Sequence, residues 1–217
     1  MVHKFTDVRY CRGVIRRLFV SACVVVTLVV AVSAGPNILK SGSFLGWKFN
    51  NHPVVCLPVS AVLVGTISVP AGPIAGYCQD RLINAAQIIR AARSLGIGPH
   101  TQAIGVMTAI GESGLRVLDY GDAAGADSRG LFQQRDNGAW GSLADRMDPY
   151  TSASNFFTQL VQKPGWKNLT PGEAAHAVQV NADPLHYDPY WARAETIVAA
   201  LGNSPAPIAN PTPSIRR

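Results

Sequence analysis

From Gln79 onward, apolar residues recur at intervals of three and four positions, which predicts a run of α-helices. The first begins at Gln79 and is ended by Gly96 and Gly98. A second is expected to start at Thr101 as its capping residue and to stop at Gly114. Residues 35–76 show no helical period.

Three later helix starts share one device, a capping residue followed by proline at the first helical position, where proline loses no hydrogen bond. They are Asp148–Pro149, Thr170–Pro171 and Asp188–Pro189. The second also reads as a capping box, with Glu173 reaching back to Thr170. Gly202 closes the last helix. Together these signals predict an all-α domain over residues 79–202.

Three segments carry other patterns. Residues 35–78 are rich in Gly, Pro, Ser and Val and are expected to form a linker or stalk with an extended segment. Residues 115–147 form a long loop, with one short helical turn expected inside the run GLFQQR. Residues 203–217 have the composition of a disordered tail.

The amino-terminus predicts export. Residues 18–34 contain no charge, and Lys4 and four arginines precede them. Basic residues before an apolar stretch stay on the cytoplasmic side, so the chain after Ala34 should be extracytoplasmic, either secreted or membrane-anchored and facing the cell wall. Val32–Ser33–Ala34 fits a signal peptidase site, whereas the apolar length is just short of a membrane span. Residues 1–34 are therefore a signal peptide or a signal anchor that would contact the membrane if uncleaved.

Composition narrows the class further. A chain with 47% hydrophobic and 15% charged residues is neither a coiled coil nor disordered throughout. The net charge of +6 comes from the two ends, and residues 35–215 carry equal numbers of acidic and basic side chains. A nucleic-acid partner is therefore not expected.

Two of the four cysteines, Cys11 and Cys23, precede the exported part of the chain. Cys56 and Cys78 lie in the exported part, where disulfides persist, and two cysteines allow one intrachain pair; two free buried thiols are the alternative. No CxxC or HxxxH spacing occurs, so neither a metal site nor a cofactor is expected. The aspartates of the long loop do not follow EF-hand spacing.

Glu112 stands out among only three glutamates. Glu173 is explained by its capping box, and Glu195 lies in mid-helix. Glu112 follows an apolar stripe at a helix carboxyl end, where the helix dipole and apolar surroundings both disfavour its ionised form. A carboxylic acid kept protonated near neutral pH can serve as a general acid, whereas a solvated helix-end glutamate would have an ordinary pKa.

Glu112–Ser113–Gly114–Leu115, followed by Gly130–Leu131–Phe132–Gln133–Gln134, resembles the lysozyme-like domain of lytic transglycosylases and goose-type lysozymes. The wider run of residues 107–141 is similar to exported lysozyme-like proteins of actinobacteria. The resemblance covers roughly residues 80–201 and implies a small all-α domain, peptidoglycan glycan strands as partner, and cleavage of the bond between N-acetylmuramic acid and N-acetylglucosamine.

Carried over position by position, the resemblance implies Glu112 as catalytic acid and Ser113 as a residue that orients it or contacts the substrate. Phe132 would line the sugar site, and Gln133 and Gln134 would bind substrate. The family's third motif, an Ala-Tyr-Asn-Ala-Gly-like turn, is degraded here and lacks its tyrosine. Its nearest match supplies Asn181 as a further candidate for substrate binding. The polar, aromatic segment 181–187 could form one wall of a cleft.

A lytic transglycosylase needs one carboxyl group, whereas a muramidase that hydrolyses the bond needs a second. Asp119, Asp122 and Asp127 are candidates for that second carboxylate, although each could equally be a turn-forming residue. The degraded third motif leaves an alternative open: a weak or inactive domain that binds glycan or belongs to an envelope secretion or conjugation apparatus, with other envelope proteins as partners.

Overall fold

The computed structural model describes residues 43–44, 47–48, 53–123 and 125–203. The expected signal peptide or anchor (1–34) and the tail from residue 204 lie outside these ranges. The chain divides into two compact units, residues 1–52 and 53–217. In the first, the two-residue strands β1 (Ser43–Phe44) and β2 (Trp47–Lys48) pair antiparallel.

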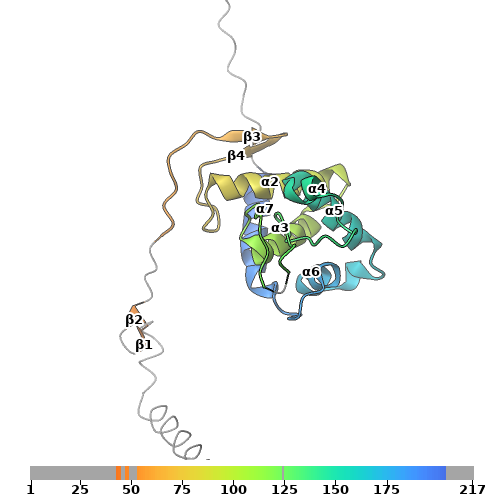
Figure 1. Ribbon diagram of the computed structural model, residues 1–217. Helices are drawn as coiled ribbons and strands as arrows, with labels where there is room; N and C mark the ends of the chain where they lie inside the picture. The colour runs from red at the N-terminus through yellow and green to blue at the C-terminus, as the bar shows by residue number, and fades with distance from the viewer. Residues whose placement is uncertain (1–42, 45–46, 49–52, 124, 204–217) are drawn as a thin grey trace, which may run out of the picture. The chain divides into compact units, whose positions relative to one another are not determined.

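The second unit is mostly helical, as the sequence predicts (Figure 1). A short hairpin, β3 (Val62–Val64) and β4 (Ile67–Val69), precedes the helices. The α-helices are α2 (Gln79–Ser94), α3 (Pro99–Ser113), α4 (Leu143–Met147), α5 (Pro149–Gln162), α6 (Pro171–Gln179) and α7 (Trp191–Gly202). Two 3₁₀ turns, η1 (Trp166–Asn168) and η2 (Asp188–Tyr190), complete it. No helix among the described residues has the length and apolarity that a membrane crossing requires.

The β3–β4 hairpin belongs to the helical unit and is not part of a separate linker. Its strands are in register with Val64 opposite Ile67, and Val64, Ile67 and Val69 are buried in the common core. Strand β4 packs on α2 and α7. Three apolar side chains that precede residue 79, the expected start of the helical domain, therefore contribute to the same core.

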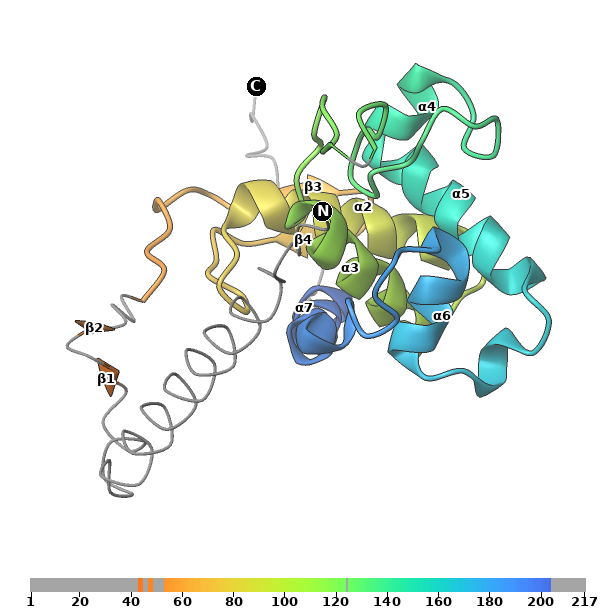
Figure 2. The same cartoon turned by 60° about the horizontal axis from the view of Figure 1, so that its bottom comes forward.

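Helix α3 lies at the centre of the unit, with α2, α6 and α7 around it in both ribbon views (Figures 1 and 2). Its residues from Gln102 to Ile110 are all buried, so both polar and apolar members face neighbouring helices. The helix begins at Pro99 with Gly98 as its cap, and Thr101 therefore lies in the first turn and does not cap it. Gly105 allows the closest approach: a Cβ there would lie 2.4 Å from the Phe157 ring.

The later helices start mostly where the capping signals stand. Asp148 caps α5 by accepting from the Thr151 N–H at 2.7 Å, and Thr170 and Glu173 form the predicted capping box of α6. The third signal is wrong in detail, since Asp188–Pro189 opens the 3₁₀ turn η2 and α7 starts at Trp191. Helix α4, with its own capping box at Ser142, lies inside the segment expected to be a loop.

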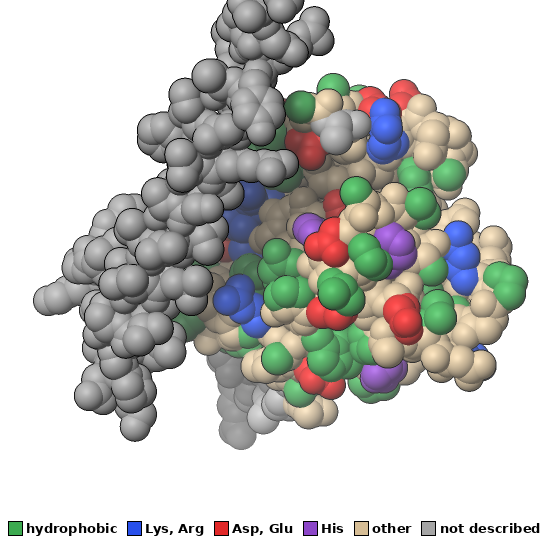
Figure 3. Space-filling model, turned by 90° about the horizontal axis from the view of Figure 1, so that it is seen from below, with side chains coloured by type: hydrophobic (Ala, Val, Ile, Leu, Met, Phe, Trp, Pro, Cys, Tyr) green, Lys and Arg blue, Asp and Glu red, His purple; other side chains and the backbone are tan. Residues whose placement is uncertain are grey.

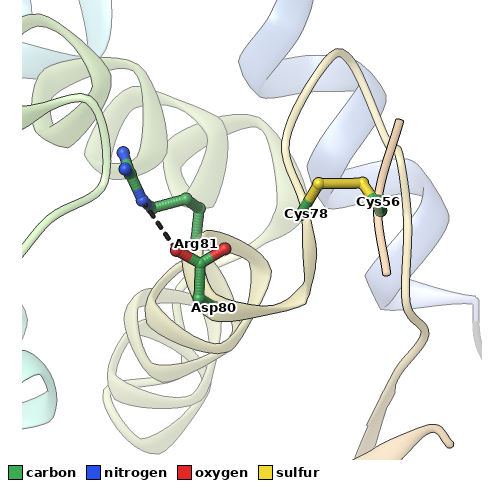
Figure 4. The surroundings of a disulfide bond; sticks show 4 residues. All are labelled: Cys56, Cys78, Asp80 and Arg81. Carbon is green, nitrogen blue, oxygen red and sulfur yellow. Dashed lines mark hydrogen bonds and ion pairs between the residues drawn. A yellow bond between two sulfur atoms is a disulfide. The ribbon is translucent and has the colours of Figure 1, made fainter. Parts of the chain in front are cut away.

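Cys56 and Cys78 form the disulfide that the cysteine count allows (Figure 4). Their Cα atoms are 5.4 Å apart, and 22 positions separate them in sequence. Cys78 directly precedes α2, so the bond ties the extended segment around Cys56 to the first helix of the unit.

Candidate active site

Glu112 lies one residue before the end of α3, the central helix. Gly114 caps that helix in the left-handed conformation (φ 60°), and its N–H donates to the carbonyl of Ile110. The cap turns the chain away sharply, because a residue with positive φ cannot continue a right-handed helix. The helix end therefore presents Glu112 at the edge of the core.

Tyr187 holds the Glu112 carboxyl group. Its hydroxyl donates a hydrogen bond to Oε1 of Glu112, across 75 positions of sequence, and its ring is fully buried. Gly111 makes the approach feasible, since a Cβ at that position would lie 2.9 Å from Cδ1 of Tyr187 and 3.3 Å from Nε2 of His186. The segment after α6 thus packs directly on the last turn of α3.

Burial raises the pKa of Glu112 above its ordinary value. The Tyr187 hydrogen bond, His186 and Gln179 lower the pKa in part, and the like charge of Asp122 raises it. The net shift is upward, so the protonated acid persists to higher pH than that of a solvated glutamate. Burial and the adjacent Glu112 also raise the pKa of Tyr187, which keeps its hydroxyl a donor.

Ser113 links the two sequence motifs. Its hydroxyl lies 2.8 Å from the carbonyl oxygen of Leu131 and 3.1 Å from that of Ala109, and it accepts from the N–H of Arg116 at 3.1 Å. It is only 3% exposed and is not among the residues that line the cavity beside Glu112. Its role here is to fasten the Leu131 turn to the end of α3.

Gly130 permits the turn of the second motif. Its φ is 77°, its N–H donates to the carbonyl of Leu118 at 2.7 Å, and a Cβ there would lie 1.8 Å from the carbonyl oxygen of Arg146. The sequence predicts a short helical turn in the run GLFQQR. The structure has an irregular turn there, in which Gln133 also has a positive φ of 47°. The carbonyl of Phe132 accepts from Nε2 of Gln179 at 2.8 Å, which ties this turn to α6.

Two residues of that motif are not where the resemblance implies. Phe132 is fully buried and stacks on Phe156 with ring centroids 5.0 Å apart, so it belongs to the core and does not line a sugar site. Gln134 is 2% exposed and donates to the Ser152 carbonyl, so it too is away from solvent. Apolar stacking explains the position of Phe132. The amide nitrogen of Gln134 has its acceptor, whereas its Oε1 is buried without a hydrogen-bond partner among the described residues.

A cavity of about 540 Å³ opens beside Glu112. Figure 3 shows a hollowed face of the molecule with acidic and histidine side chains at the edge of the hollow. The cavity is lined by the end of α3, by the loop that follows it as far as Gln133, and by the segment after α6. Its walls are Gly111, Glu112, Arg116, Leu118, Tyr120, Gly121, Asp122, Ser128, Gln133, Asn181, Ala182, Asp183 and His186.

The structure separates the three aspartates proposed as a second carboxylate. Asp122 lines the cavity, and its Oδ1 accepts from the Gly125 N–H at 2.8 Å. Asp119 is exposed and does not line it. Asp127 pairs with Arg135 at 2.8 Å and accepts from the Asp136 N–H, and the Arg135 hydrogen bond, followed by that of Asp136, lowers its pKa to about 2.

The segment after α6 forms one wall of the cavity, as expected. Asn181 is there, with its Oδ1 2.7 Å from Nδ1 of His176. Asp183 and His186 line the same wall. Sequence reasoning missed the contact of Tyr187 with Glu112, because no spacing rule joins residues so far apart; its only signal was the aromatic, turn-like character of this segment.

Across residues 53–123 and 125–203, no three His, Cys, Asp or Glu side chains gather in a way that could hold a metal ion. The site consists of the partly buried Glu112 carboxyl group, its tyrosine donor and a polar cavity that Asp122 and Asp183 also line. In comparisons with known proteins, no family model matches the sequence and no curated protein matches it.

Proposed function

We propose that the chain is an exported enzyme that cleaves peptidoglycan glycan strands at the bond between N-acetylmuramic acid and N-acetylglucosamine, with Glu112 as general acid. The observation that carries the proposal is the Glu112 carboxyl group, held by Tyr187 at the edge of a 540 Å³ cavity with its pKa raised by burial. Cavities of this size accept ligands of a few sugar rings or less.

The chemistry follows from that carboxyl group. Protonated Glu112 donates its proton to the bridging oxygen, the glycosidic bond breaks, and positive charge develops on the sugar ring. Glu112, now a carboxylate, then takes a proton from the attacking nucleophile, which is either the 6-hydroxyl of the muramic acid or water. The Tyr187 hydrogen bond stabilises the carboxylate during this interval and keeps it oriented.

Asp122 supports water as the nucleophile. It is the only one of the three candidate aspartates that lines the cavity, and it is close enough to Glu112 for its charge to raise the pKa of Glu112. A hydrolase needs such a second carboxylate, either to stabilise the cation while Glu112 takes the proton from water or to take that proton in place of Glu112. Its presence favours a muramidase over a lytic transglycosylase.

A non-catalytic glycan-binding or structural role in an envelope apparatus is the second candidate. The degraded third motif favours it, because the expected tyrosine is absent near Asn181. Tyr187 weakens that argument, since a tyrosine from another position donates to Glu112. Retained peptidoglycan binding by a wild-type chain that releases no fragments would support this second function.

Glu112→Gln tests the enzyme directly. Lysis of purified peptidoglycan should fall by roughly 10²- to 10⁴-fold, because the amide N–H is too weak an acid to protonate the bridging oxygen. Glu195→Gln, which removes an exposed helical carboxylate, should retain full activity. Undiminished lysis by the Glu112 variant would exclude Glu112 as the acid.

The same variant has a stability signature. A group whose pKa is raised by folding stabilises the native state at low pH, and that contribution is lost as pH rises through the folded pKa. Glu112→Gln removes this loss, so the variant should gain stability relative to wild type as pH rises above the ordinary glutamate pKa of 4.5 and through the raised pKa of Glu112. Thermal melts over that range measure the difference and also show that the inactive variant is folded.

A further inference from the structure

An extended segment of the second unit is apolar on its exposed side. Half of the exposed large hydrophobic side chains of the described chain, six of twelve, lie within residues 54–63. Val55 is 86% exposed and Leu57 79%, and Val59 follows at the same spacing of two. Alternation of this kind places the three side chains on one face of an extended strand.

The backbone N–H and C=O groups of this segment are almost all without a hydrogen-bond partner in the described part of the chain. Within the described part of the chain, the carbonyl of Ser60 accepts from Nε2 of Gln79 at 2.8 Å, and residues 53–61 form no other backbone hydrogen bond. Such a row of N–H and C=O groups is a template for another strand. A lipid surface satisfies these groups poorly, because hydrocarbon offers no hydrogen-bonding partner.

The segment is held in position and not free to collapse. The disulfide joins Cys56 to Cys78 at the start of α2 (Figure 4), and Gln79 also donates to the carbonyl of Val69 in strand β4. A mostly apolar groove of about 390 Å³ lies along it. The exposed row is therefore pre-organised, which lowers the entropic cost of pairing.

The edge that faces outward can be identified. In an extended strand, alternate residues direct their N–H and C=O groups to the same edge. Ser60 directs its carbonyl to Gln79 of the domain, so Pro58, at even spacing from it, shares that inner edge, where its missing N–H costs nothing. Val55, Leu57 and Val59 then share the outer edge, and each has an N–H group to offer.

Charge selects the occupant. No Asp, Glu, Lys or Arg occurs from Pro53 to Gln79, and Asp80, which lines the groove, is paired with Arg81 at 3.0 Å. The surface therefore carries no uncompensated charge that would select a charged partner. Two copies of the segment meet without like-charge repulsion and without desolvating a charge. An antiparallel pair of identical strands is also self-complementary about a two-fold axis.

The chain outside the described residues adds to this. Eighteen residues separate Ala34, the end of the uncharged stretch, from Pro53. Chains anchored by that stretch would hold their segments in one thin layer at the membrane and raise their effective concentration.

We infer that two copies of this chain associate through residues 55–59, paired antiparallel with Leu57 opposite Leu57 on the two-fold axis and Val55 opposite Val59. The pairing supplies about six inter-chain backbone hydrogen bonds on the outer edge. It also sets the apolar side chains of one copy beside those of the other on one face, so that each row covers part of its neighbour's apolar surface. The inference is independent of the proposed catalytic function.

The test is sedimentation equilibrium of the full chain in density-matched detergent micelles. Wild type should show a concentration-dependent dimer. Leu57→Asp and Leu57→Lys should each weaken association by at least tenfold, because like charges directly opposite repel, and an equimolar mixture of the two should restore the dimer. Leu143→Asp, which alters an apolar side chain 54% exposed elsewhere, should leave association unchanged.

Hydrogen exchange locates the contact. The amides of Val55, Leu57 and Val59 should be protected at high chain concentration and exchange freely on dilution. A wild type that is monomeric at all concentrations, or a dimer that survives Leu57→Asp, overturns the inference. Protection of these amides in a monomeric chain means that detergent or lipid covers the row, and overturns it as well.

Discussion

Removing one oxygen atom at Tyr187 tests how the acid is positioned. Tyr187→Phe keeps the buried ring and deletes only the hydroxyl that donates to Glu112. A hydrogen bond to a group that becomes charged is worth roughly 1.5–3 kcal/mol, so its loss in the transition state lowers the rate on the order of 10- to 150-fold. We expect most of this loss in kcat, since the hydroxyl does not line the cavity and should contribute little to substrate binding.

The pH profile distinguishes positioning from simple damage to the fold. The Tyr187 hydrogen bond lowers the pKa of Glu112, so its removal should raise that pKa further. The general acid acts when protonated, and the alkaline limb of kcat/KM therefore moves to higher pH in the variant. The assay is release of soluble fragments from purified peptidoglycan between pH 4 and 9.

Tyr150→Phe is the matched control. It also removes one tyrosine hydroxyl with a side-chain partner, the Oγ of Ser94 at 2.9 Å, away from the cavity. Both variants should lose about 1 kcal/mol of stability. Equal activities of the two variants, or an alkaline limb that stays in place in Tyr187→Phe, would refute the assigned role of the tyrosine.

Three further outcomes follow from the geometry. Asp122→Asn should lower release of reducing ends by on the order of 10²-fold while Asp119→Asn leaves it unchanged, and mass spectrometry of the products shows whether anhydro ends appear instead. Gly130→Ala should destabilise by about 3 kcal/mol or more in denaturant melts, because its Cβ would collide with a backbone carbonyl, whereas Gly138→Ala, with similar φ and open space, should cost about 1 kcal/mol. Cys56→Ser, with its partner cysteine also changed, should cost about 3 kcal/mol by the entropy of a 22-residue loop, and no change in the melting temperature would contradict this.

The helices could be predicted because local signals dominate them. Pro149 and Pro171 follow capping residues, and the helices start where those signals stand. The β3–β4 hairpin could not, since strands of three residues are too short to show alternation. Asp188 failed as a helix cap because the chain makes a 3₁₀ turn before α7, a choice fixed by packing and not by the dipeptide.

Only some residues of the candidate site could be predicted from the sequence. Glu112 could be selected because neither a cap nor mid-helix solvation accounts for it. Phe132 was misassigned, since sequence does not tell an apolar residue that lines a cleft from one that stacks in the core. Asp119 and Asp122 are the same residue type three positions apart, and only the path of the loop brings one of them to the cavity.

The bond between Tyr187 and Glu112 also has a consequence in time. Glu112 is synthesised 75 residues before Tyr187, which donates a hydrogen bond to it. At ordinary rates of synthesis this separation takes on the order of 4–15 s. Throughout that interval the nascent chain contains Glu112 but not the Tyr187 hydroxyl that holds its carboxyl group. The proposed catalytic group is completed only when the last part of the domain has docked, so a chain released early would keep both sequence motifs and still lack the hydrogen bond from Tyr187 to Glu112.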